Sequence, residues 1–179
     1  MFTPVGPMLD HWREFYLLIG TAAATLVALL FVAASIGVGR VSADRTSASR
    51  TYMSPVVLHF TAVLLGSLIG LLPSHTRGSL GILIGAGALG AGCYAIVRFI
   101  TVAHAGGEDS AVDFADRLAY GVAPVIGYAI GLVAAGLFFA GSHWAPHVFA
   151  GALIWLLTVN IRNAWDLTLF LAGRHTGSH

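Results

Sequence analysis

The chain alternates between long apolar stretches and short polar connections. Continuous apolar runs cover about residues 15–38, 54–72, 79–103, 118–141 and 148–171. Each run is at least as long as the roughly 20 residues that an α-helix needs to cross a bilayer, or within one residue of that length. The pattern therefore predicts an all-α protein with five transmembrane helices. Because the connections are short, we expect one helical bundle and a single domain over residues 1–179.

Composition narrows the class of protein further. Only 9% of the 179 residues are charged and 57% are apolar, with a mean hydropathy of +0.83, whereas a soluble domain carries about 25% charged residues. A soluble fold of this size cannot bury so much apolar surface, and the hydropathy also excludes disorder. A nucleic-acid interface would need many more cations to neutralise phosphates. We therefore predict an integral membrane protein with the lipid bilayer as its first partner and with no nucleic acid partner.

Arginines at the ends of the runs predict an orientation, because positively charged connections tend to remain cytoplasmic. The side that holds the N-terminal tail carries Arg13 and Arg77. The opposite side carries more arginines, namely Arg40, Arg45, Arg50, Arg98, Arg117 and Arg174. We therefore expect a bacterial-type inner (plasma) membrane protein with its N-terminus outside and its C-terminus in the cytoplasm. Ser110, Asp113 and Arg117 have the spacing of a helix start, which predicts a cytoplasmic extension of the fourth helix.

Glycine is abundant, with 22 residues, and it follows helical faces. In the third run small residues recur every three or four positions, at Gly78, Gly81, Gly85, Ala88, Gly92 and Ala95. The second and fourth runs have similar faces, at Ala62, Gly66 and Gly70 and at Gly121, Pro124, Gly131 and Ala135. Such spacing favours close helix packing over a glycine-lined pore. We expect the third helix to lie at the centre of the bundle or to form an oligomer contact.

Polar groups inside the runs are few, and in a membrane such groups mark a functional site or a structural network. At about 1.5 Å per residue, all of them lie in the half of the bundle assigned to the cytoplasmic side. Most share a helix face with the small residues. We therefore predict a buried polar cluster, open toward the cytoplasm, made of His59, Tyr94, Arg98, Tyr128, Asn160, Arg162, Asn163 and Asp166.

Three interpretations of this cluster remain open. Arg162 and Asp166 are four residues apart and can pair within a purely structural network. Two arginines beside one acid instead favour a site for an anion or a small polar solute. His59 and Asp166 also have the chemistry of a proton relay.

Histidines on the predicted outer side do not require a metal. Four lie there, at His11, His75, His143 and His147. Trp12 and Trp144 occur in the same segments, which is typical of an interfacial belt. A haem held by two histidines needs two at similar depth, and only His59 lies inside a run. The single cysteine, Cys93, excludes a Cys-based metal site within one chain. We therefore expect neither a metal nor a cofactor.

Catalytic motifs are not evident. The sequence has no phosphate-binding loop, zinc-protease helix or serine nucleophile elbow, and Cys93 with His59 is the one pair suited to covalent catalysis. Enzymatic activity is therefore disfavoured but open. We expect a small channel, transporter or solute-binding membrane protein that forms a homo-oligomer and uses the polar cluster as its site. The alternative is a non-catalytic accessory or assembly subunit that docks other membrane subunits through its glycine faces.

Overall fold

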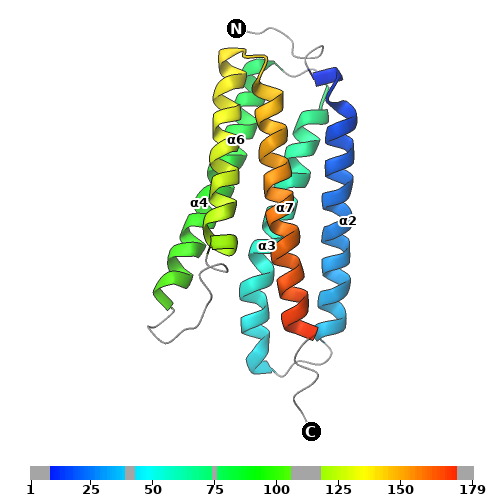
Figure 1. The fold of residues 1–179 in the computed structure, drawn as a ribbon, viewed down its shortest axis with the longest axis vertical. Helices are drawn as coiled ribbons and strands as arrows, with labels where there is room; N and C mark the ends of the chain where they lie inside the picture. Colours follow the sequence, from blue (N-terminus) through cyan, green and yellow to red (C-terminus); the bar gives the residue numbers. More distant parts are fainter. Residues whose placement is uncertain (1–8, 39–42, 74–75, 106–117, 173–179) are drawn as a thin grey trace.

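The protein is a bundle of long helices. The computed structural model describes residues 9–38, 43–73, 76–105 and 118–172. Its elements are α2 (Arg13–Val38), α3 (Ala43–Leu71), α4 (Arg77–Ala105), the π-helical turn η1 (Leu118–Val122), α6 (Ala123–Ala140) and α7 (Ala145–Ala172). The long helices lie side by side and consecutive ones run in opposite directions (Figure 1). The all-α prediction is confirmed for the described residues, and each long helix covers most of one apolar run.

Four of these helices are long and apolar enough to cross a bilayer, within the described ranges. The qualifying segments are Arg13–Ala33, Arg77–Thr101, Tyr120–Ala140 and Ala145–Asp166. The apolar part of α3 is shorter, at Pro55–Leu71, and would be about 25 Å long against a hydrocarbon core of about 30 Å. Length and composition therefore indicate a multi-pass membrane protein with four qualifying helices, where the sequence pattern predicted five.

Helix α3 also begins earlier than the apolar pattern predicted. It starts at Ala43, so that Pro55 lies inside the helix. The hydrophobic run marks only the part of a helix that is soluble in lipid, and the helix itself can continue beyond it into water. Pro124 lies in the first turn of α6, where the missing N–H costs little. The predicted helix start at Ser110, Asp113 and Arg117 lies outside the described residues.

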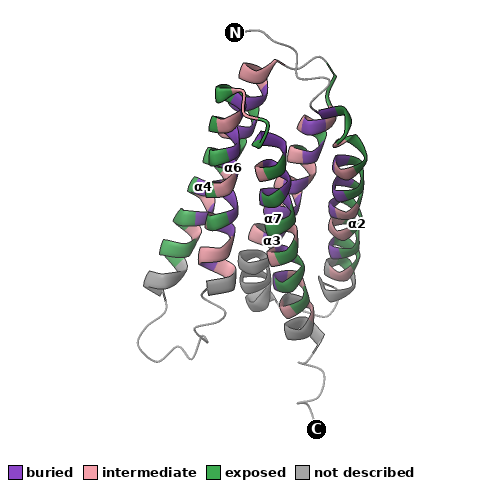
Figure 2. Cartoon of the chain, turned by 45° about the horizontal axis from the view of Figure 1, so that its top comes forward, coloured by how far each residue is buried: buried purple, intermediate pink, exposed green. Residues whose placement is uncertain are grey.

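The helices meet on their small residues, as predicted. A Cβ placed on Gly66 would lie 2.9 Å from Leu153 of α7. One placed on Gly131 of α6 would lie 3.3 Å from the Ala88 side chain of α4. Figure 2 shows the buried residues along the inner sides of the helices. Backbones can approach this closely only where no larger side chain intervenes, so the glycine faces of the sequence are packing faces.

The centre of the bundle is α7 and not the glycine-rich α4. Helix α7 packs against α2, α3 and α6, whereas α4 packs mainly against α6 and lies at one side (Figure 1). The third run is therefore not central, and of the two alternatives predicted for it only the oligomer contact remains a prediction. Glycine allows one close neighbour, here α6, but the number of neighbours depends on how the other helices are arranged.

The turn between α6 and α7 closes one end of the bundle. Gly141 has a φ of 69°, a left-handed conformation that glycine adopts without strain, and it ends α6. The Arg77 guanidinium packs over Gly141, in the space that a Cβ would occupy. A cation at this position also faces the negative end of the α6 dipole. Arg77 thus joins the start of α4 to the end of α6.

Candidate functional site

A buried hydrogen bond joins α3 to α6. The His59 Nδ1 atom lies 2.7 Å from the Tyr128 hydroxyl oxygen. Both side chains are almost fully buried, with exposed fractions of 3% and 4%. Tyr128 reaches His59 from a position where it also packs over Gly92 of α4. The pair therefore connects three helices, and it confirms that these two predicted site residues come together.

Two asparagines of α7 extend this polar layer. Asn160 donates from Nδ2 to the Val56 carbonyl of α3 at 2.8 Å, and the Tyr120 hydroxyl of η1 donates to the Asn163 carbonyl at 2.8 Å. Both asparagine side chains are buried. Hydrogen bonds thus connect α3 with α6, α3 with α7, and η1 with α7. In a bilayer each such bond contributes about 0.6 to 2 kcal/mol and fixes the helix register.

Tyr120 was not among the residues predicted for this site. It lies in the π-helical turn η1, where the extra residue per turn changes which side chains face α7. No pattern of apolar residues indicates a π-helical turn, so its contact with Asn163 could not be found from the sequence. Trp155 provides a further bond of the same kind, from its indole N–H to the Ala123 carbonyl at 2.8 Å.

Arg162 and Asp166 lie apart from this layer. Their side chains are 50% and 35% exposed, and the Arg162 Nε atom lies 4.0 Å from Asp166 Oδ2. The prediction that Arg162 lies in one buried cluster with the asparagines is therefore wrong, whereas Asp166 is half-buried and its Oδ2 atom is enclosed. Two residues along a helix amount to a rotation of about 200°, so Arg162 points away from the face that carries Asn160. The pair is correctly predicted, but its face is not.

Tyr94 and Arg98 of α4 are the remaining predicted residues. They are one helical turn apart and both are partly buried. Each makes an interaction within the chain. Tyr94 also lines the cavity described next, together with Tyr128, so the polar layer meets this cavity at one of its ends.

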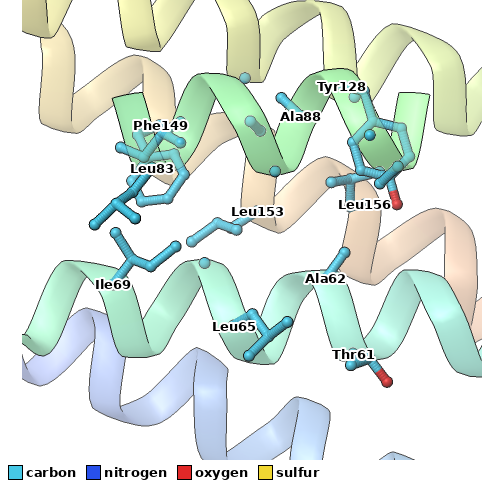
Figure 3. Close-up of a pocket in the computed structure, with 18 of the residues that line it drawn as sticks. Thr61, Ala62, Leu65, Ile69, Leu83, Ala88, Tyr128, Phe149, Leu153 and Leu156 are labelled. Atoms are coloured by element: carbon cyan, nitrogen blue, oxygen red, sulfur yellow. The ribbon is translucent and has the colours of Figure 1, made fainter. Parts of the chain in front are cut away.

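A groove of about 380 Å³ runs between α3 and α4, with α6 and α7 as its floor. Its lining is mostly aliphatic and includes Leu65, Gly87, Gly90 and Leu153 (Figure 3). Leu65 is 54% exposed and both glycines are exposed, so the groove opens at the side of the bundle. A Cβ on Gly87 or on Gly90 would meet nothing within 4 Å. These glycines therefore keep the groove open.

The groove was not predicted from the sequence. Gly87 and Gly90 lie outside the stripe of small residues that packs on α6. The available signal was that α4 carries small residues on a second face. A helix with two small faces and one close neighbour leaves the second face open.

Metal-binding groups do not gather in the described part of the chain. No set of three His, Cys, Asp or Glu side chains there could hold a metal ion. His147 instead packs its ring against Trp12 and Trp144, with centroid distances of 4.7 and 5.3 Å. His75 lies outside the described residues. Of the histidines predicted to lie outside, His143 and His147 therefore make aromatic contacts of the kind expected at a membrane interface.

The described residues thus form a hydrogen-bonded polar layer, a partly exposed ion pair and a lateral apolar groove. Tyr128 belongs to both the layer and the groove. In comparisons with known proteins, no family model, no curated protein and no solved structure matches the chain.

Proposed function

We propose that this protein is a solute-binding membrane protein that takes a chain-like apolar molecule from the bilayer into the groove between α3 and α4. The single observation that carries this proposal is the shape of the groove. Three of the four helices that form it, α4, α6 and α7, are long and apolar enough to cross a membrane, and it opens sideways at exposed residues such as Leu65 and Leu83. A molecule dissolved in the hydrocarbon core can therefore enter it without crossing water.

The dimensions of the groove support one chain as occupant. Its lining on α4 extends from Leu83 to Tyr94, which is about 16 Å at 1.5 Å per residue. A volume of 380 Å³ over that length describes a narrow, elongated groove, which is the shape that one extended hydrocarbon chain fills.

The chemistry of the lining supports an apolar occupant over an ion. Among the described residues that line the groove, the polar side chains are those of Thr61, Tyr94 and Tyr128, and none carries a formal charge. The Thr61 hydroxyl already donates to the Val57 carbonyl, and the Tyr128 hydroxyl is bonded to His59. An ion would lose its hydration here without gaining ligands, and that loss is costly.

The membrane topology belongs to the same proposal. We include α3 as a fifth span, because its apolar part lies beside the qualifying helices and polar residues flank it at its start. The arginine distribution supports an outer N-terminus and a cytoplasmic C-terminus in a bacterial-type inner membrane. The polar layer and Arg98 then lie toward the cytoplasmic side.

Native mass spectrometry of the delipidated full chain tests the proposed function. Titration with oleyl alcohol, a neutral single-chain probe, should give one saturable bound molecule per chain. Gly87→Leu should abolish this binding by filling the groove. Gly136→Leu is the matched control, because Gly136 also has open space around it but does not line the groove. Equal binding by both variants would refute the groove as the site.

An accessory role in a larger membrane complex is the second candidate. The observation in its favour is that Gly136 of α6 and Gly151 of α7 are exposed with open space around them, so that another helix can approach the bundle there. Purification in mild detergent should then recover other chains at a fixed ratio. Recovery of this chain alone, still able to bind oleyl alcohol, would argue against that role.

A further inference from the structure

We propose that the occupant of the groove is a long-chain fatty acid whose carboxylate binds Arg98. This inference rests on the proposed function, because it names the solute that the groove takes. The inference adds three points that the shape of the groove alone does not determine. These are the headgroup of the ligand, the orientation of the ligand in the groove, and the residue that selects the headgroup.

The groove has a polar end and an apolar end. Thr61, Tyr94 and Tyr128 lie at one end, whereas Ile69, Leu83 and Phe149 lie at the other. Figure 3 shows Tyr128 and Thr61 far from Leu83 and Phe149 along the groove. An amphiphile therefore lies with its tail toward Phe149 and its headgroup toward Tyr94.

Arg98 follows this polar end by one helical turn. Four residues along a helix amount to a net rotation of about 40°, so Arg98 lies nearly on the face of α4 that carries Tyr94. It lies three residues before the end of the spanning segment at Thr101, or about 4.5 Å inside it. This is the depth at which a charged headgroup near the membrane surface and a partly buried arginine can meet.

The charge of Arg98 complements an anion. A guanidinium group presents five N–H donors, so it can hold a headgroup in addition to an interaction within the chain. A carboxylate matches its planar fork with two parallel hydrogen bonds. The described lining residues of the groove are uncharged. The positive charge of Arg98 at the polar end is therefore the feature that makes the groove bind an anionic amphiphile more tightly than a neutral one.

The distances favour a long single chain. From Arg98 to Leu83, the far end of the lining on α4, the separation is about 22 Å at 1.5 Å per residue. A single chain of this length can lie along the groove with its carboxylate at Arg98, about 6 Å beyond the last lining residue of α4. A phospholipid would leave its second chain outside. We therefore name the fatty acid as the occupant.

Competition between oleate and oleyl alcohol tests this inference on the purified full chain. The two probes share a chain and differ in the headgroup. Native mass spectrometry should show a preference for oleate of about tenfold or more, the effect expected of a charge-assisted pair of hydrogen bonds. Arg98→Gln should lose this preference and still bind oleyl alcohol, which also shows that the variant is folded. Arg98→Lys should keep part of the preference.

Arg162→Gln is the matched control, because it removes an exposed arginine of α7 and should leave the preference unchanged. Equal binding of the two probes by the unaltered chain would overturn the inference while leaving the proposed function intact. A preference for phosphatidylglycerol over oleate would overturn the fatty acid as occupant. If neither single-chain probe binds, both the inference and the proposed function fail.

Discussion

Gly70→Ala offers a sharp test of how α2 and α3 pack. A Cβ at Gly70 would lie 2.8 Å from Cδ2 and 2.9 Å from Cγ of Tyr16, closer than real Cβ contacts. The Tyr16 ring is 0% exposed and packs against Trp12 and Phe149, with ring centroids 6.4 and 5.8 Å away. The ring therefore cannot swing aside, and the helices must separate to admit the methyl group.

The expected cost can be isolated with a second glycine. Overpacking a buried contact costs about 1–3 kcal/mol, while alanine is favoured over glycine in a helix by up to about 1 kcal/mol. Gly136→Ala gains the same helix preference without a clash, because a Cβ there meets nothing within 4 Å. The preference cancels between the two variants, so Gly70→Ala should be about 1–3 kcal/mol less stable than Gly136→Ala.

Reversible unfolding in mixed detergent micelles, with increasing mole fraction of SDS, measures this difference. The unaltered chain should lie between the two variants or close to Gly136→Ala. If Gly70→Ala and Gly136→Ala unfold at the same SDS fraction, the close contact between Gly70 and Tyr16 does not exist in the membrane protein, and the packing of α2 against α3 is refuted.

Three further predictions follow from the polar residues and from Cys93. Tyr128→Phe removes the partner of His59 and should destabilise the bundle by about 1 kcal/mol in the same unfolding assay; an unchanged midpoint would contradict the hydrogen bond. Arg162→Ala should change stability by less than about 0.5 kcal/mol, since the ion pair is exposed, whereas loss of the folded chain would make the pair structural. Cys93 is exposed on α4 and should react with maleimide in micelles. In sealed vesicles a charged, water-soluble thiol reagent should not reach it, and equal labelling would contradict the membrane span of α4.

The positions of the long helices and most of their packing faces could be predicted from the sequence. Apolar runs mark lipid-soluble helices because the bilayer imposes a minimum length. Small residues at steps of three and four mark close contacts because they lie on one helical face, as Gly85 and Ala88 do against α6. The contact between His59 and Tyr128 could be predicted in the same way. Each residue lies on the small-residue face of its helix, and the two lie at a similar depth in their apolar runs.

Other features depend on how the helices are arranged around one another. Arg162 was assigned to the interior because an intramembrane charge usually faces the bundle, yet its helix presents Asn160 and Asn163 there instead. The groove arises because α4 has one close neighbour and leaves Gly87 facing open space. Sequence periodicity identifies a face that can be packed, but it does not tell which partner will cover that face.

Photolabelling tests the central claim, that the groove takes a single chain from the bilayer, most directly. The full chain in lipid nanodiscs would be irradiated with an oleyl alcohol analogue that carries a diazirine on its chain, and the adducts mapped by peptide mass spectrometry. The account predicts adducts concentrated on residues 58–69 of α3 and 83–94 of α4, and their loss in Gly87→Leu but not in Gly136→Leu. Adducts spread evenly over the outer faces of all helices, unchanged by Gly87→Leu, would contradict it.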